Sequence, residues 1–219
     1  MDKSTPDIQI NILDKIETYS VKRGGNFINL GCYDGLTNDP IADLIINNDL
    51  KGWFIDANEE ILNRCRKNFI GDSYKFECLG IHSKSGIFDF YIAKGNPEMP
   101  AWFGQTSTFL KQRVDDLKAE LSIGDDMFDV IKLRTERIDE FISERGITEL
   151  EIINIDLEGL DEDIIMDFPF HIIKPKYIII ELLYTHKTVN QRSVDYIISQ
   201  GYEYVQTIEL FSMVFKLKN

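Results

Sequence analysis

Short apolar runs alternate along the chain with stretches in which apolar residues recur every three or four positions. The runs predict strands at residues 26–31, 51–56, 73–79, 150–156, 176–183, 202–208 and 211–218. The amphipathic stretches predict helices at about 7–20, 38–48, 58–69, 137–145, 160–168 and 190–200. The run YIIIELL is apolar at nearly every position, which is typical of a parallel strand covered by helices on both faces. The pattern therefore predicts a doubly wound, Rossmann-like α/β fold.

The end of the chain breaks this alternation. Phe211 follows the run at residues 202–208 too closely for a crossover helix, which needs roughly a dozen residues. We therefore expect a C-terminal antiparallel hairpin that closes an otherwise parallel seven-stranded sheet. No repeat, low-complexity tract or linker rich in Gly, Pro or Ser divides the sequence, so residues 1–219 are expected to form one domain.

The segment at about 80–136 interrupts the alternation of strands and helices. It begins with a turn at Ser83–Gly86 and an alternating strand, and continues as an irregular stretch with prolines and aromatic residues. VDDLKAEL predicts a short helix, and DVIKLRTERI predicts an extended segment. An insertion placed before the fourth core strand is expected to act as a lid or substrate platform. The alternative is a surface decoration without a chemical role.

Composition narrows the class of protein. A formal net charge of -13 argues against nucleic-acid binding, which depends largely on Lys and Arg displacing counterions. The three cysteines, at positions 32, 65 and 78, form no CxxC pair and are expected to be reduced thiols. The N-terminus lacks the pattern of a signal peptide, and no apolar run reaches membrane-spanning length. We therefore expect a cytoplasmic protein that binds no nucleic acid and has no membrane span.

The stretch FINLGCYDGLTNDPI leads from the first strand through Gly31 and Gly35 toward a helix. A glycine at the end of a strand lets the backbone approach a ligand closely, because no Cβ is in the way. A plain turn would have the same composition. The nicotinamide-dinucleotide fingerprint requires Gly-x-Gly-x-x-Gly, whereas Tyr33 here holds the middle position, where its side chain would obstruct a pyrophosphate. The loop therefore disfavours a dinucleotide.

Asp56 ends the second strand, about twenty residues beyond the glycine loop, where an acid can accept hydrogen bonds from both hydroxyls of a ribose. The alternative role is the N-cap of the following helix, for which we favour Asn58. Asp56 is then expected to be free for the ligand. A glycine loop without a phosphate cradle, followed by a ribose-binding acid, suits a nucleoside cofactor that carries no phosphate.

The stretch IINIDLEGLDEDII places Asp156 at the end of the fourth core strand and Glu158 in the loop that follows. Ligands of open α/β sheets bind outside the carboxyl ends of the strands, where the strand order reverses. Asp156 and Glu158 should therefore face the same space as the glycine loop. The acids at 161–163 are assigned to the first turn of a helix, where they complement its dipole.

These stretches resemble the FkbM-type S-adenosylmethionine (SAM)-dependent methyltransferases. The matching stretches span roughly residues 27–183 and are NLGCYDGLTNDP, WFIDANEE, IHSKSG, NIDLEGLDEDII and KPKYIIIEL. Three positions depart from the family pattern: Asn29 replaces an acid, Asp56 replaces the more usual Glu, and Asn154 replaces Lys. The resemblance implies the class I SAM methyltransferase fold, of which the predicted C-terminal hairpin is typical.

The resemblance also implies a set of site residues. The expected SAM-binding residues are Gly31, Cys32, Tyr33, Asp34, Gly35, Asp56, Ala57, Gly80, Ile81 and Asp156. A base that removes the proton of an acceptor hydroxyl is sought among Asp156, Glu158 and His186. Alternatively, Asp156 and Glu158 could hold a divalent cation that orients substrate hydroxyls, since hard cations take oxygen ligands.

Three functions follow from this reading of the sequence. The first is O-methyl transfer from SAM to a hydroxyl of a small molecule or glycan. The second is a non-catalytic SAM-binding or scaffold protein, which the replacements at Asn29 and Asn154 motivate. The third is a nicotinamide-dependent oxidoreductase, which the glycine spacing disfavours.

Overall fold

The computed structural model describes residues 20–182, 190–208 and 212–218. The helix predicted at about 7–20 falls outside the described residues except for its last position. The candidate base His186 also lies outside them.

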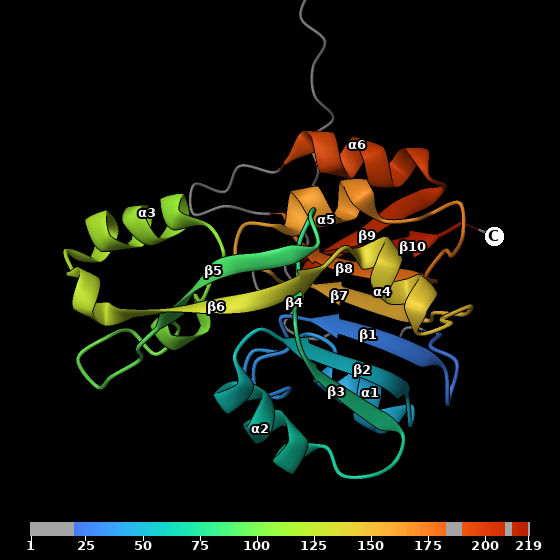
Figure 1. Cartoon of the computed structure of the whole chain (residues 1–219). Coiled ribbons are helices and arrows are strands. Elements are labelled where there is room, and N and C mark those ends of the chain that lie inside the picture. Colours follow the sequence, from blue (N-terminus) through green and yellow to red (C-terminus); the bar gives the residue numbers. More distant parts are fainter. Residues whose placement is uncertain (1–19, 183–189, 209–211, 219) are drawn as a thin grey trace, which may run out of the picture.

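The seven strands predicted from the apolar runs form one sheet (Figure 1). In spatial order they are β3 (Tyr74–Cys78), β2 (Lys51–Asp56), β1 (Asn26–Leu30), β7 (Ile152–Ile155), β8 (Tyr177–Glu181), β10 (Ser212–Leu217) and β9 (Tyr202–Ile208). The first five run parallel, whereas β10 pairs antiparallel with both β8 and β9. The doubly wound sheet and its C-terminal antiparallel hairpin are therefore confirmed.

Helices cover the two faces of this sheet. Side chains of α1 (Ala42–Asn47) and α2 (Glu59–Asn68) join one buried apolar cluster, and those of α4 (Ile138–Glu144), α5 (Asp161–Asp167) and α6 (Gln191–Ser199) join another. Successive strand residues alternate between the two clusters, which explains why the parallel strands are apolar throughout. No helix in the described residues has the length and apolar content needed to cross a membrane.

The predicted insertion builds a second, three-stranded sheet. Its strands are β4 (Gly80–Ile81), β6 (Phe128–Glu136) and β5 (Gly86–Ala93), and its helices are η1 (Phe103–Gln105), α3 (Lys111–Leu121) and η2 (Asp125–Met127). Figure 1 shows β5 and β6 as a long ribbon that extends away from the main sheet, with α3 toward its far end. A small apolar cluster that includes Phe103, Val114, Leu117 and Phe128 fills this part. The strand, the short helix and the extended segment that forms β6 were expected from the sequence, but their assembly into a second sheet was not.

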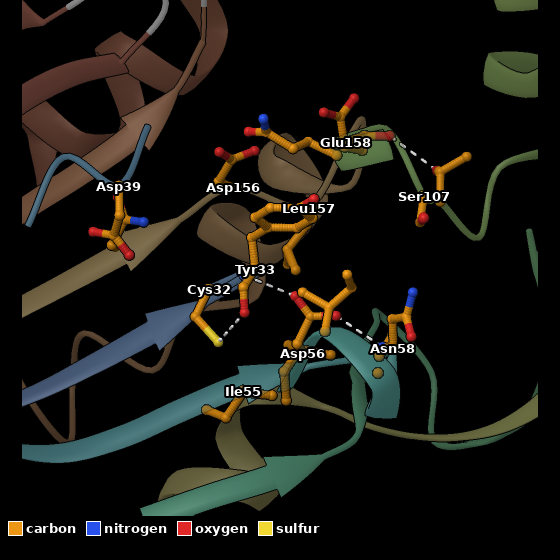
Figure 2. A pocket seen from close by; sticks show the side chains of 18 of the residues that line it. Cys32, Tyr33, Asp39, Ile55, Asp56, Asn58, Ser107, Asp156, Leu157 and Glu158 are labelled. Carbon is orange, nitrogen blue, oxygen red and sulfur yellow. Dashed lines mark hydrogen bonds between the residues drawn. The ribbon is translucent and has the colours of Figure 1, made fainter. Parts of the chain in front are cut away.

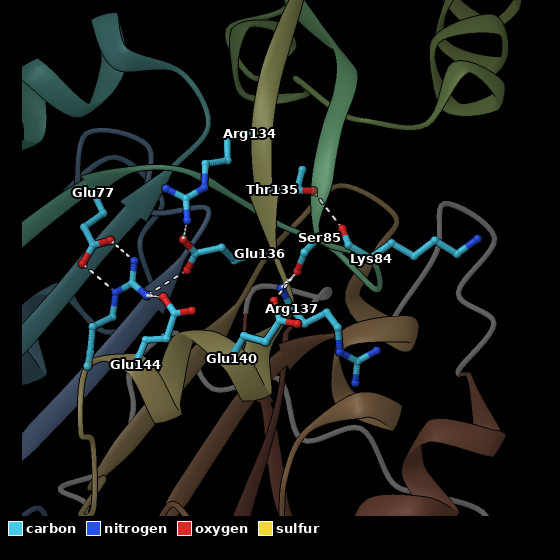
Figure 3. Close-up of polar contacts among 10 residues, drawn as sticks. Glu77, Lys84, Ser85, Arg134, Thr135, Glu136, Arg137, Glu140 and Glu144 are labelled. Atoms are coloured by element: carbon cyan, nitrogen blue, oxygen red, sulfur yellow. Dashed lines mark hydrogen bonds and ion pairs between the residues drawn. The ribbon is translucent and has the colours of Figure 1, made fainter.

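A group of charged side chains, the Arg145 cluster, joins the insertion to the main sheet (Figure 3). Arg145, just after α4, donates from Nε to Glu77 Oε1 on β3 at 2.9 Å and from Nη1 to Glu136 Oε2 on β6 at 2.8 Å. Arg134 reaches the other oxygen of Glu136 at 2.7 Å. Because Glu136 is only 4% exposed, these contacts supply the neutralisation that a buried carboxylate requires.

Candidate functional site

A pocket opens at the carboxyl ends of β1, β2 and β7 (Figure 2). It encloses about 870 Å³ of empty space, part of which is open to solvent. In sequence the chain moves from β1 outward to β2 on one side, and β7 and β8 lie on the other side. The pocket therefore lies where the strand order reverses, which is the usual ligand position in open α/β sheets.

The structure brings most of the predicted site residues together. Those that line the pocket are Gly31, Cys32, Tyr33, Asp56, Ala57, Gly80, Ile81, Asp156 and Glu158. Asp34 and Gly35 are not part of its lining. The expected convergence of the loops after the first, second and fourth core strands is thus found, while the binding roles of the residues remain predictions.

Gly31 lines the pocket for a reason other than the expected one. Its φ is +71°, and a Cβ at this position would lie 1.7 Å from the carbonyl oxygen of Asp156. The missing side chain thus makes room for the loop after β7 and not directly for a ligand. Gly31 is required because the loops after β1 and β7 pass so close to each other.

Asp34 and Gly35 shape the first loop from behind the pocket. Asp34 Oδ1 accepts hydrogen bonds from the backbone N–H groups of Leu36 and Thr37, at 3.0 and 2.7 Å. Gly35 has a φ of +75°, and a Cβ there would come within 2.7 Å of the Phe69 ring. These residues therefore hold the loop in place and are not part of the pocket lining, and their role in cofactor binding stays a prediction.

The sequence suggested that the Asp56 side chain is free for a ligand, but both of its oxygens accept backbone hydrogen bonds. Its Oδ2 accepts from the N–H of Tyr33 at 2.9 Å, and its Oδ1 accepts from the N–H of Asn58 at 2.8 Å. Asn58 is the N-cap of α2, as predicted, since its side chain accepts from the N–H of Glu60. Burial raises the pKa of Asp56 to about 6, although the two backbone hydrogen bonds oppose this shift. The two backbone hydrogen bonds fix the position of the carboxylate at the pocket wall.

Asp156, at the end of β7, is paired with a second carboxyl group. It shares a hydrogen bond with Glu181 at the end of β8. Burial, and then the charge of Asp156, raises the pKa of Glu181 to about 10, so the two carboxyl groups together keep one proton near neutral pH. Glu181 is the second-last residue of KPKYIIIEL, one of the stretches that carry the family resemblance, but it was not selected as a site residue.

Glu158 lies between the main sheet and the insertion. Its backbone has a φ of +49°, which non-glycine residues rarely adopt. Its carbonyl oxygen accepts a hydrogen bond from Thr108 Oγ1 at 3.0 Å, and its carboxylate lies 3.5 Å from Nη2 of Arg113 on α3. Burial, followed by the charge of Asp156, raises the pKa of Glu158 to about 8, and Arg113 opposes this shift.

Asp161 has a more specific role than the expected complement to the helix dipole. Its two carboxylate oxygens accept from the N–H groups of Leu157 and Gly159, at 2.9 and 3.1 Å. It thereby shapes the turn that presents Glu158 to the pocket. Burial raises its pKa to about 7, and these backbone hydrogen bonds oppose the shift.

The insertion supplies one side of the pocket. Phe90, Gly104, Gln105, Ser107, Thr108 and Phe109 line it. Asn38 also reaches Gln105 across the opening, with 3.4 Å between Nδ2 and Oε1. Sequence reasoning placed a lid or substrate platform here but named no residue, because the fold of this stretch depends on contacts far apart in sequence.

Asn29 and Asn154, two of the three departures from the resembled family pattern, hydrogen-bond to each other across β1 and β7. Asn29 also donates to Asp39, a pocket residue that sequence reasoning missed. The stretch NDP reads as a simple turn, so no signal in the sequence marked Asp39. The loss of the acid at position 29 therefore does not leave the first loop without an anchor.

The chemistry of the lining favours one class of cofactor. The lining includes the carboxylates of Asp39, Asp56, Asp156 and Glu158 but no Lys, Arg or His from the described part of the chain. Phosphates are usually bound by such cations or by glycine-rich backbone, so this wall suits a phosphate-free and positively charged ligand. Among the described residues, no group of three or more His, Cys, Asp or Glu side chains is arranged to hold a metal ion, so the metal option for Asp156 and Glu158 gains no support.

One curated protein is similar to this chain in sequence. The 2-O-methyltransferase NoeI of Sinorhizobium fredii is 24% identical over 156 residues, which are 70% of this chain and 61% of that protein. The chain thus spans less than two thirds of that relative.

Two solved structures were also matched to this chain. One is the methyltransferase FkbM from Methylobacillus flagellatus, with a TM-score of 0.51 and 14% identity over 89% of this chain and 44% of that one. The other is a TehB-like SAM-dependent methyltransferase from Corynebacterium glutamicum, with a TM-score of 0.39 and 11% identity over 90% of this chain and 82% of that one.

The family match covers both sides of the pocket. The methyltransferase FkbM domain matches residues 29–209, from β1 to the end of β9. Since this is most of the chain and includes the loops after β1, β2 and β7, the protein belongs to the FkbM methyltransferase family.

Proposed function

We propose that this chain is a SAM-dependent O-methyltransferase that transfers a methyl group to a hydroxyl of a small molecule or glycan. The proposal rests mainly on the pocket at the reversal of strand order. Asp56 and three further carboxylates line this pocket, and no Lys, Arg or His of the described residues lines it to bind a phosphate. Family membership supports methyl transfer, and the name of NoeI, a 2-O-methyltransferase, supports oxygen as the acceptor atom.

Asp56 would bind the ribose of the cofactor. Each of its oxygens accepts one backbone N–H, and a carboxylate oxygen has a second lone pair, which leaves one acceptor position for each ribose hydroxyl. Leu79, whose N–H donates to the Asp56 carbonyl, and Ile81 line the pocket and would offer apolar surface to the adenine ring. Among the described residues, no Lys, Arg or His lines this pocket to bind the phosphates of a dinucleotide.

Glu158 would act as the general base. SAM, when bound, supplies a methyl group on a cationic sulfur, and the protein mainly aligns the acceptor oxygen with that carbon. As the new C–O bond forms and the C–S bond breaks, the hydroxyl proton would pass to Glu158. A pKa near neutrality suits this role, and Glu158 borders the insertion, which we propose forms the acceptor platform. Asp156 is the weaker candidate because it already shares a proton with Glu181.

The cofactor assignment is tested by titration calorimetry with S-adenosylhomocysteine. Asp56→Ala should weaken binding about tenfold or more, because hydrogen bonds to a charged group contribute roughly 1.5 to 3 kcal/mol each. Asp72→Ala, which changes an exposed acid beyond α2, is the control and should leave the affinity within twofold of wild type. Equal affinity for all three proteins would overturn the ribose assignment, and thermal stabilisation by NADH alone would favour an oxidoreductase.

The catalytic assignment is tested by SAM consumption with a panel of hydroxylated acceptors. Glu158→Gln should lower kcat about 100-fold or more and leave S-adenosylhomocysteine affinity within a few fold. Wild-type binding without turnover on any acceptor would instead support a scaffold protein. The structure offers that alternative no added support, since Asn29 and Asn154, which motivated it, form an intact hydrogen-bonded pair.

A further inference from the structure

A chain of three side chains runs from the main sheet into the pocket wall. Asn29 on β1 and Asn154 on β7 are register partners, and they are 0% and 3% exposed. Asn154 Nδ2 donates to Asn29 Oδ1 at 3.0 Å, and Asn29 Nδ2 donates to Asp39 Oδ2 at 2.6 Å. The N–H of Ile41 donates to the other oxygen, Asp39 Oδ1, at 2.8 Å. The polar groups of the buried amides are thereby used to hold one carboxylate in place.

The charge of Asp39 has no cation partner in the described residues. Asp39 and Asn154 both line the pocket, and no ion pair within the described part of the chain includes Asp39. Burial raises the pKa of Asp39 to about 7 despite its hydrogen bonds. Asp39 is half-buried, and a carboxylate that is largely removed from water is costly unless it is paired, so this wall is suited to a positively charged ligand group.

The position of Asp39 separates it from the proposed ribose site. Asp56 ends β2 on one side of β1, whereas Asn154 lies in β7 on the other side. In Figure 2, Asp39 and Asp56 lie on different sides of Asp156 and Tyr33. A ligand whose ribose binds Asp56 would reach Asp39 with the opposite end of the molecule. In SAM that end is an amino acid, which carries an α-ammonium group.

We propose that Asp39 is a cofactor-binding residue that accepts a hydrogen bond from the α-ammonium group of SAM. This inference rests on the proposed function. The family pattern has an acid at position 29 and Lys at position 154, whereas this chain has neutral amides at both. The negative charge of this wall lies ten residues further along, on Asp39, and the two amides position it.

The test compares two ligands and two proteins by calorimetry. The ligands are S-adenosylhomocysteine and its desamino analogue, in which hydrogen replaces the α-amino group; the proteins are wild type and Asp39→Asn. Removing either partner should weaken binding about tenfold or more. Removing both should cost little beyond the first change, because the same contact is lost. Asp43→Asn, an exposed acid on α1, is the control variant and should bind both ligands as wild type does.

The outcomes separate this inference from the proposed function. If wild type binds S-adenosylhomocysteine through Asp56 but binds the desamino analogue equally well, the role of Asp39 is overturned and the cofactor assignment stands. This comparison needs no variant, so it holds even if Asp39→Asn does not fold. Additive losses in the folded variant would also overturn the inference. Failure of wild type to bind S-adenosylhomocysteine at all would overturn the proposed function itself.

Discussion

Two groups of carboxylates in this protein differ in what neutralises them. In the Arg145 cluster, Glu77 and Glu136 contact guanidinium groups at hydrogen-bond distance. The pocket acids Asp39, Asp56, Asp156 and Glu158 instead face backbone N–H groups, amides or one another, and their one described cation contact is Arg113 at 3.5 Å. The first group uses its charge to join two parts of the fold. The second has no cation partner at such short distance, and burial raises the pKa of each of its members.

The largest expected effect comes from breaking the Arg145 cluster. Arg145→Met should lower the free energy of unfolding by about 3 to 5 kcal/mol, because it leaves the buried carboxylate of Glu136 without its main partner. Arg134→Met should cost less than about 1 kcal/mol, since that side chain is 71% exposed. Urea unfolding at pH 7 measures both. Equal losses of unfolding free energy in the two variants would show that the buried Arg145 contributes no more to stability than the exposed Arg134.

A smaller effect should appear in the pH dependence of the ligand-free protein. The pocket acids have folded pKa values of about 6 to 8, above those of an unfolded chain, so the folded state retains protons that the unfolded state has lost. Stability from these groups is fully present below about pH 4 and is lost as the pH rises through 6 to 8. The slope should be at most about 1.4 kcal/mol per pH unit for each titrating group.

Urea unfolding from pH 5 to 8 checks this slope. Glu158→Gln should flatten the part near pH 8, and saturating S-adenosylhomocysteine should flatten the part due to Asp39. If the free energy of unfolding of the ligand-free protein rose from pH 5 to 8, the pocket acids would not have the raised pKa values given above.

The smallest change in stability is expected at the contact between Arg113 and Glu158. Arg113→Gln should alter the free energy of unfolding by less than about 1 kcal/mol, because both side chains are partly exposed. It should nevertheless raise the pKa of Glu158 further, since Asp156 and Asp161 remain nearby and the opposing cation is gone. Carboxyl ¹³C NMR titration measures this shift. Lys111→Gln, on the exposed side of the same helix, is the control, and an equal titration of Glu158 in both variants would refute the coupling.

The sequence predicted the main sheet well because its evidence is local. Apolar runs mark strands that are buried on both faces, and the short spacing before residues 212–217 leaves room only for a hairpin. The convergence of Gly31, Asp56 and Asp156 followed from one rule about where parallel strands end. None of these steps required knowledge of a contact between distant side chains.

What the sequence did not reveal depends on such contacts. Arg145 meets Glu77 across 68 positions, and Thr108 meets Glu158 across 50, so no spacing rule connects them. The role of Gly31 depends on how closely a separate loop passes, and that of Asp39 depends on a pair of amides 125 positions apart. Residue types indicated which chemistry to expect, but tertiary packing determined which acid is neutralised.

The insertion leaves and rejoins the main fold at neighbouring points, since Gly80 and Ile81 on β4 pair with Thr135 and Glu136 on β6. Its distal part, from β5 to the start of β6, has an apolar cluster of its own. Changes in the length or sequence of that part therefore leave the strands that carry Asp56 and Asp156 in place. Under the proposed function, a chimera that carries another family member's equivalent of residues 82–134 should therefore keep its affinity for S-adenosylhomocysteine and change only its acceptor.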